Sequence, residues 1–126
     1  MSDFTPTEYR ELTGLTTADV SRYAKHGYIR PKRKNPELGE ASGNVFIWTK
    51  QDVLAAKAHE LLSTLYTGPM LHLLANLCAD AIYSGKAKEG DMLLISKPEA
   101  VIYTNEAEWL RDGPQNLAVI HLPDSV

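Results

Sequence analysis

Six basic side chains gather in one short stretch of this chain, and phosphate binding is the chemistry that such a stretch favours. No acidic residue occurs between Val20 and Pro36, and the bases there are Arg22, Lys25, Arg30, Lys32, Arg33 and Lys34. The whole chain nevertheless has a formal net charge of −3, and acids outnumber bases from Thr67 onward. A basic segment within an acidic chain indicates a local site for a polyanion. The alternative interpretation is a charged surface that only faces solvent. The predicted elements around the basic stretch favour one interpretation or the other.

No other group of residues in the sequence predicts catalysis. The four histidines are far apart and share no metal-ligand spacing. Cys78 lies in an apolar helical pattern, which favours a place in the core over a nucleophilic role. Neither Ser42-Gly43 nor the segment from Gly85 to Gly90 has the pattern of a phosphate loop. We therefore predict a protein that is not an enzyme and uses no cofactor or metal.

The chain length and its apolar segments predict a soluble protein without a membrane partner. No apolar stretch approaches the ~20 residues needed to cross a bilayer. The start, Met1-Ser2-Asp3-Phe4, lacks the basic and apolar regions of a signal peptide. A single cysteine cannot form an internal disulfide and fits a reducing compartment. We expect a cytoplasmic protein.

Two short helices are predicted around the start of the basic stretch. Thr5-Pro6-Thr7-Glu8 has the residues of a capping box with proline at the first helical position, and Gly14 can end that helix. Thr16 caps a second helix, with Asp19 three residues on, and Gly27 ends it. Helices this short are not stable alone, so they need a shared core. The residues expected there are Tyr9, Leu12, Leu15, Val20 and Ile29.

A hairpin and a third helix are predicted to follow. Tyr28-Ile29 has the pattern of a short extended piece, and residues 32 to 43 form an exposed loop rich in proline and glycine. Val45 to Trp48 is a β-branched and aromatic strand that returns along the hairpin, with Trp48 expected in the core. Thr49 to Asp52 then repeats the capping pattern and starts the third helix.

The second half of the chain predicts two amphipathic helices and a small ββαβ tail. The helices, split at Gly68-Pro69, could pack as a hairpin or against a second copy, and we expect dimer contacts from Leu54, Ala58, Leu61, Leu65, Leu71, Leu74, Leu77 and Cys78. Strands are predicted at 92–95, 100–103 and 117–120, with a short helix from Asn105. The fold class is therefore α+β. The predicted domains are residues 1–66 and 67–126.

The order of these elements and several short motifs resemble the DNA-binding domain of the MerR-like regulators, the mercury-resistance repressor family. Its Gly-apolar-Ser/Thr turn is similar to Gly14-Leu15-Thr16-Thr17, and its Arg/Tyr-Tyr pair to Arg22-Tyr23. Gly27-Tyr28-Ile29-Arg30-Pro31 matches its Gly-Leu-apolar-x-Pro step. Trp48-Thr49-Lys50-Gln51-Asp52 matches the start of the helix after its wing. The resemblance runs from Thr5 to Leu62, half of the chain.

The resemblance implies a winged helix-turn-helix, with one helix in the major groove and a wing beside it. It implies a sequence-specific transcriptional regulator of bacterial or phage origin, bound to double-stranded DNA as a homodimer. The implied DNA contacts are Thr16, Thr17, Ala18, Ser21, Arg22, Tyr23, Lys25, Arg30, Lys32, Arg33 and Lys34. Arg22 is the main candidate for a guanine edge or a phosphate. Ser21 and Phe46 stand where the family often carries arginine, so we expect the basic wing loop to contribute more than in its relatives.

Two other functions remain open at this point. Excisionase-like architectural proteins of recombination share the winged fold, although they need little beyond it. A protein-interaction module, similar to an antitoxin or an adaptor, is the alternative of a different class, with a protein partner on the acidic C-terminal region. Binding to random duplex DNA separates this module from the DNA-binding functions, because phosphate contacts lose affinity steeply with salt.

Overall fold

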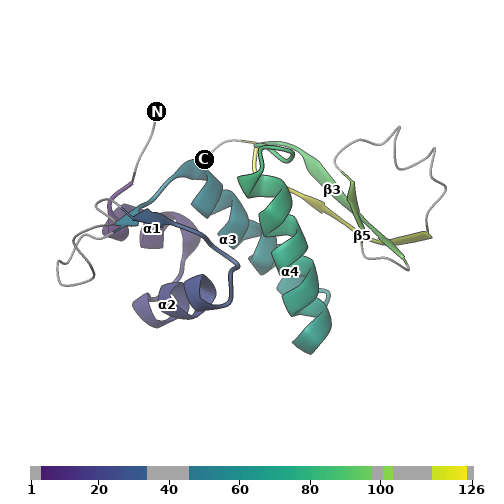
Figure 1. Cartoon of the computed structure of the whole chain (residues 1–126), viewed down its shortest axis with the longest axis horizontal. Helices are drawn as coiled ribbons and strands as arrows, with labels where there is room; N and C mark the ends of the chain where they lie inside the picture. The colour runs from purple at the N-terminus through teal and green to yellow at the C-terminus, as the bar shows by residue number, and fades with distance from the viewer. Residues whose placement is uncertain (1–3, 34–45, 98–100, 104–114, 125–126) are drawn as a thin grey trace.

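The computed structural model of the chain describes residues 4–33, 46–97, 101–103 and 115–124, and these residues form an α+β fold (Figure 1). Their elements, in chain order, are α1 (Pro6–Thr13), α2 (Thr17–Lys25), β1 (Lys32–Arg33), β2 (Phe46–Ile47), α3 (Lys50–Ser63), α4 (Gly68–Tyr83), β3 (Met92–Lys97), β4 (Val101–Tyr103) and β5 (Gln115–His121). None of the helices described is long and apolar enough to cross a membrane.

Local capping fixes where α1 and α2 begin. The Thr5 hydroxyl accepts a hydrogen bond from the Glu8 backbone N–H, and the Glu8 carboxylate accepts one from the Thr5 N–H. Thr16 and Asp19 make the same reciprocal pair at the start of α2. Gly14 has a φ of 74°, the left-handed conformation in which α1 ends. Both predicted helix starts are confirmed.

A two-stranded antiparallel hairpin follows α2. Lys32 lies opposite Ile47, and Arg33 lies opposite Phe46. Tyr28-Ile29, predicted as the first strand of the hairpin, is not a strand. The N–H groups of both residues donate to the Tyr23 carbonyl, which keeps this segment folded against the end of α2. Lys34 and the rest of residues 34–45, on which the predicted loop falls, lie outside the described residues.

Helices α3 and α4 pack against each other as a hairpin. This is one of the two arrangements predicted from their apolar faces. Figure 1 shows α1, α2 and the β1–β2 hairpin on one side of this pair and the three-stranded sheet on the other. The sheet is antiparallel in the order β4-β3-β5, which confirms the three predicted strands. The helix predicted from Asn105 lies in a part of the chain that the structure does not describe.

One hydrophobic core joins both halves of the chain. Tyr9, Ile29 and Trp48 from the first half share it with residues of α4 and of the sheet such as Ile82 and Leu93. The Tyr9 and Trp48 rings stack with their centroids 4.4 Å apart. The predicted boundary between residues 66 and 67 is therefore not a boundary between two cores.

Of the five residues expected to share the core between the first two helices, four do so. Tyr9 and Ile29 are fully buried, and Leu15 and Val20 are partly buried against the same core. Leu12 is the exception: its side chain is 40% exposed, because α1 turns that face toward solvent.

Candidate nucleic-acid interface

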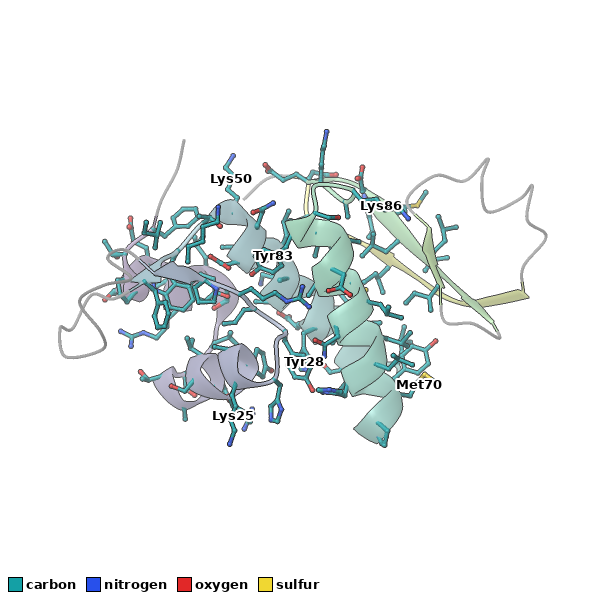
Figure 2. The ribbon with its side chains drawn as sticks, in the orientation of Figure 1. Lys25, Tyr28, Lys50, Met70, Tyr83 and Lys86 are labelled. Atoms are coloured by element: carbon teal, nitrogen blue, oxygen red, sulfur yellow. The ribbon has the colours of Figure 1, made fainter. Side chains whose placement is uncertain are left out.

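Helix α2 has one face on the core and one face in solvent. Val20, Tyr23 and Ala24 pack against the core. Ala18, Ser21, Arg22 and Lys25, all predicted as DNA contacts, are exposed. Figure 2 shows Lys25 at the outer edge of α2, away from α4. The helix therefore presents small side chains and two cations together, a surface that can approach a large polyanion closely.

The hydroxyls of two predicted contacts at the start of α2, Thr16 and Thr17, already accept hydrogen bonds within the protein. The Thr16 hydroxyl accepts from the Asp19 N–H at 3.1 Å and so caps the helix. The Thr17 hydroxyl accepts from Nη1 of Arg10 at 2.7 Å. Arg10, in the last turn of α1, was not among the predicted site residues, and its position in a basic last turn is the only sequence signal that could have indicated it. It adds a positive charge beside the start of α2.

Arg22 is held by an ion pair that leaves it accessible. Its Nη2 lies 2.8 Å from Oδ1 of Asp19, its guanidinium lies over the Tyr23 ring, and 58% of its side chain is exposed. Backbone and side-chain hydrogen bonds from Thr16, followed by the charge of Arg22, lower the pKa of the Asp19 carboxyl below its ordinary value. Asp19 is thus ionised at neutral pH and orients Arg22 without burying it.

Tyr23 is an anchor of α2 rather than a free phosphate contact. Its ring lies 4.4 Å from the His59 ring of α3 and meets the Tyr28 ring edge-on at 5.7 Å. These contacts fix the orientation of α2 on α3. Tyr23 is half-buried, so only the exposed part of its side chain could reach a phosphate as predicted.

Arg30, also predicted as a DNA contact, makes several contacts within the protein. Its Nη1 lies 2.7 Å from Oδ1 of Asp80 on α4, and its Nε donates to the Gly27 carbonyl at 3.0 Å. The guanidinium also lies over the Tyr83 ring, whose hydroxyl accepts from the Arg30 backbone N–H and donates to Oδ1 of Asp52. These contacts hold the Arg30 side chain, which is 36% exposed, against α4.

Further contacts tie the end of α2 to α4. Nδ2 of Asn76 donates to the His26 carbonyl, which belongs to the residue that ends α2. The Tyr28 hydroxyl lies 2.9 Å from Nδ1 of His72, and Figure 2 shows Tyr28 between α2 and α4. Through these bonds α4 sets the direction in which α2 points.

The hairpin adds positive charge to that of Arg10 in α1 and of Arg22 and Lys25 in α2. Lys32 in β1 is exposed. Arg33 lies opposite Phe46 in the same hairpin, although its side chain is not described. The sequence-predicted site therefore divides into an α2 surface, a hairpin with Lys32, and Arg30, which belongs to neither.

The predicted dimer contacts also divide into two groups. Leu54, Ala58, Leu74 and Cys78 are buried in the core of the chain itself, so the prediction that they meet a second chain is wrong. They are covered because α3 and α4 pack on each other and on the sheet. Leu71 and Leu77 are only partly buried, and Leu61 and Leu65 are exposed.

Within the described residues, no group of three or more His, Cys, Asp or Glu side chains could hold a metal ion. Burial raises the pKa of the Cys78 thiol to about 12, which leaves it protonated and unreactive. The cations that the structure places on one surface are Arg22 and Lys25 of α2.

No protein-family model matches the chain, and no curated protein is detectably similar to it in sequence.

Proposed function

We propose that this protein is a sequence-specific DNA-binding transcriptional regulator with a MerR-like winged helix-turn-helix. One observation carries the proposal: α2 exposes Ala18, Ser21, Arg22 and Lys25 on a single face while its other face is anchored on the core. A capped helix held rigidly with small and basic side chains outward can enter the major groove of DNA.

In this arrangement each element has a separate task. Arg22 reaches a guanine edge or a phosphate, and exchanges its ion pair with Asp19 for that contact. Lys25 and Arg10 contact the phosphates that flank the groove, which position the helix without reading sequence. The hairpin acts as the wing, where Lys32 lies near the backbone or the minor groove.

A salt titration on duplex DNA tests the proposal. We expect the logarithm of the binding constant for random duplex DNA to fall linearly with the logarithm of the salt concentration. The slope should be roughly −0.9 for each phosphate contact. On a selected operator, Arg22→Ala is expected to cost ~1–3 kcal/mol of binding free energy. Lys88→Ala, which removes an exposed lysine after α4, is the matched control and should leave affinity unchanged.

Two results would overturn the proposal. The first is an absence of duplex binding at low salt, which would favour a protein-interaction module. The second is equal operator affinity for Arg22→Ala and Lys88→Ala, which would show that α2 does not recognise the DNA sequence. A DNA-bending activity with no transcriptional effect would instead assign the same surface to an architectural protein.

A further inference from the structure

Asp19 is the one acidic residue of α2, and it lies beside the cations of this helix. Its two carboxylate oxygens have separate partners. Oδ2 accepts a hydrogen bond from the Thr16 N–H at 3.2 Å, which caps the start of α2. Oδ1 lies 2.8 Å from Nη2 of Arg22, and 28% of the Asp19 side chain is exposed. The cap therefore uses one oxygen and leaves the other to Arg22.

The Asp19 carboxylate is a fixed negative charge on a helix that otherwise exposes cations. Hydrogen bonds from Thr16, followed by the charge of Arg22, lower the pKa of Asp19, so this side chain is ionised and can only accept hydrogen bonds. A negative charge at this position weakens the attraction of α2 for phosphates. The bond to the Thr16 N–H needs an oxygen, whereas the effect on DNA depends on the charge. An experiment can therefore separate the two roles.

Asp19 lies in the part of α2 that would meet base edges in the proposed complex. The first residues of the recognition helix make such contacts in a helix-turn-helix, and Asp19 is at the third helical position. When Arg22 gives up its ion pair for a guanine, Oδ1 of Asp19 loses its donor. Bases in one strand are about 3.4 Å apart, which is close to the 2.8 Å between Oδ1 and Nη2. With Arg22 on a guanine, Oδ1 therefore faces the neighbouring base pair.

Only some bases offer a hydrogen bond to this oxygen. The donors in the major groove are the amino groups of cytosine and adenine, whereas guanine and thymine present acceptors there. Adenine places its N7 acceptor beside the amino group, where it repels the carboxylate, and cytosine presents its N4 donor without such a neighbour. A carboxylate that faces an acceptor has lost its hydrogen bond in a partly desolvated interface, which costs free energy. Cytosine is therefore the best partner for Asp19.

We propose that Asp19 determines sequence specificity by requiring a cytosine beside the guanine that Arg22 contacts. This inference rests on the proposed function, because it assigns a base preference to the same helix. Arg22 alone can bind any accessible guanine or phosphate. With Asp19 beside it, every other neighbouring base leaves an unpaired charge in the interface, so specificity rises while affinity for random DNA falls.

Asp19→Asn separates the charge from the cap. The Asn amide oxygen can still accept from the Thr16 N–H, but the charge is lost and the amide N–H groups can donate to thymine or guanine. Glu8→Gln is the matched control, because the Glu8 carboxylate accepts from the Thr5 N–H in the same type of cap on α1. Circular dichroism checks that both variants are folded.

Base selection from randomised duplex DNA and competition binding measure the effect. We expect the wild type to select cytosine beside the guanine, and to bind about tenfold more weakly when thymine replaces this cytosine. Asp19→Asn should bind random duplex more tightly than Glu8→Gln does, and its preference for the selected site over random duplex should fall about tenfold. Glu8→Gln should keep the wild-type base preference. Loss of a cap alone would weaken both kinds of binding, so opposite changes identify the charge of Asp19.

Two outcomes would overturn the inference while the DNA-binding proposal stands. The first is a wild-type protein that selects a site with no preference for cytosine beside the guanine. The second is an Asp19→Asn variant with the same base preference and the same random-duplex affinity as Glu8→Gln, which would leave Asp19 as a helix cap only. If the wild type binds no duplex DNA at low salt, the proposed function itself fails, and the inference fails with it.

Discussion

Gly27 is a residue at which both backbone conformation and space exclude a side chain. Its φ is 79°, and a Cβ there would lie 2.9 Å from Oδ1 of Asn76. We expect Gly27→Ala to lower the free energy of unfolding by about 2–3 kcal/mol, from left-handed strain plus displacement of Asn76. Gly14→Ala is the matched control, because Gly14 has a φ of 74° but no atom within 4 Å of its added Cβ. Urea denaturation measures both, and equal losses would show that Asn76 gives way freely.

His59 makes the stability of the fold depend on pH. It is buried, its Nδ1 has no hydrogen-bond partner, and burial followed by the charge of Arg22 lowers its pKa below the ordinary 6.5. The unfolded chain therefore binds the proton more readily than the folded protein. Stability from this group is present above about pH 6.5 and falls as the pH drops below that value.

Replacement of His59 by phenylalanine removes this dependence. We expect the wild type to lose unfolding free energy between pH 7 and pH 5 relative to His59→Phe, by about 1.4 kcal/mol for each pH unit that separates the unfolded and folded pKa of His59. His121→Phe, at an exposed histidine of β5, controls for the loss of a histidine as such. Parallel stability curves for the wild type and His59→Phe would contradict the prediction.

At the scale of the elements, local signals were readable from the sequence and distant pairings were not. The starts of α1 and α2 follow from Thr5 with Glu8 and from Thr16 with Asp19, each only three residues apart. The partner of Arg30 is Asp80, fifty residues away, and no local pattern indicates it. An arginine next to a basic run can bind DNA or form an internal ion pair equally well. The ion pair of Arg30 therefore becomes visible only when the packing of α4 is known.

The same limit applies to the apolar faces of α3 and α4. The heptad-like spacing identified Leu54, Ala58, Leu61 and Leu65 as one stripe, and the stripe exists. Its first half is buried by α4 and the sheet, whereas Leu61 in the last turn of α3 and Leu65 beyond the end of α3 are exposed. Periodicity shows which face is apolar, but it does not show which element covers it.

The β1–β2 hairpin allows a test at the level of one element. If the proposed function is correct, the hairpin acts as a wing, and its charge is expected to supply much of the phosphate binding, because Ser21 and Phe46 stand where the MerR-like family often has arginine. We expect Lys32→Ala, Arg33→Ala and Lys34→Ala together to cost more affinity than Lys25→Ala. The log–log salt slope should fall by about 3 in the triple variant and by about 1 in the single one. A larger loss for Lys25→Ala would assign the main phosphate contact to α2.

At the scale of the whole molecule, the half that contains α1 and α2 and the half that contains the sheet share one core. Leu74, Cys78 and Ile82 of α4 are fully buried in the core that also contains Tyr9 and Ile29. The hydroxyl of Tyr83, also on α4, donates to the buried Asp52, which desolvation leaves with a raised pKa despite that bond. Helix α2, at nine residues, is too short to be stable without such support.

A fragment of residues 1–66 is therefore expected to lack a cooperative fold. It loses the α4 side of the core, including Leu74, Cys78 and Ile82, which are fully buried in the full chain. Thermal unfolding followed by circular dichroism should show a broad, weak transition for the fragment and a sharp one for the full chain. Duplex binding by the fragment should be weaker than that of the full chain at the same salt. A sharp transition with full affinity would show that the first 66 residues are a domain by themselves and that α4 only orients them.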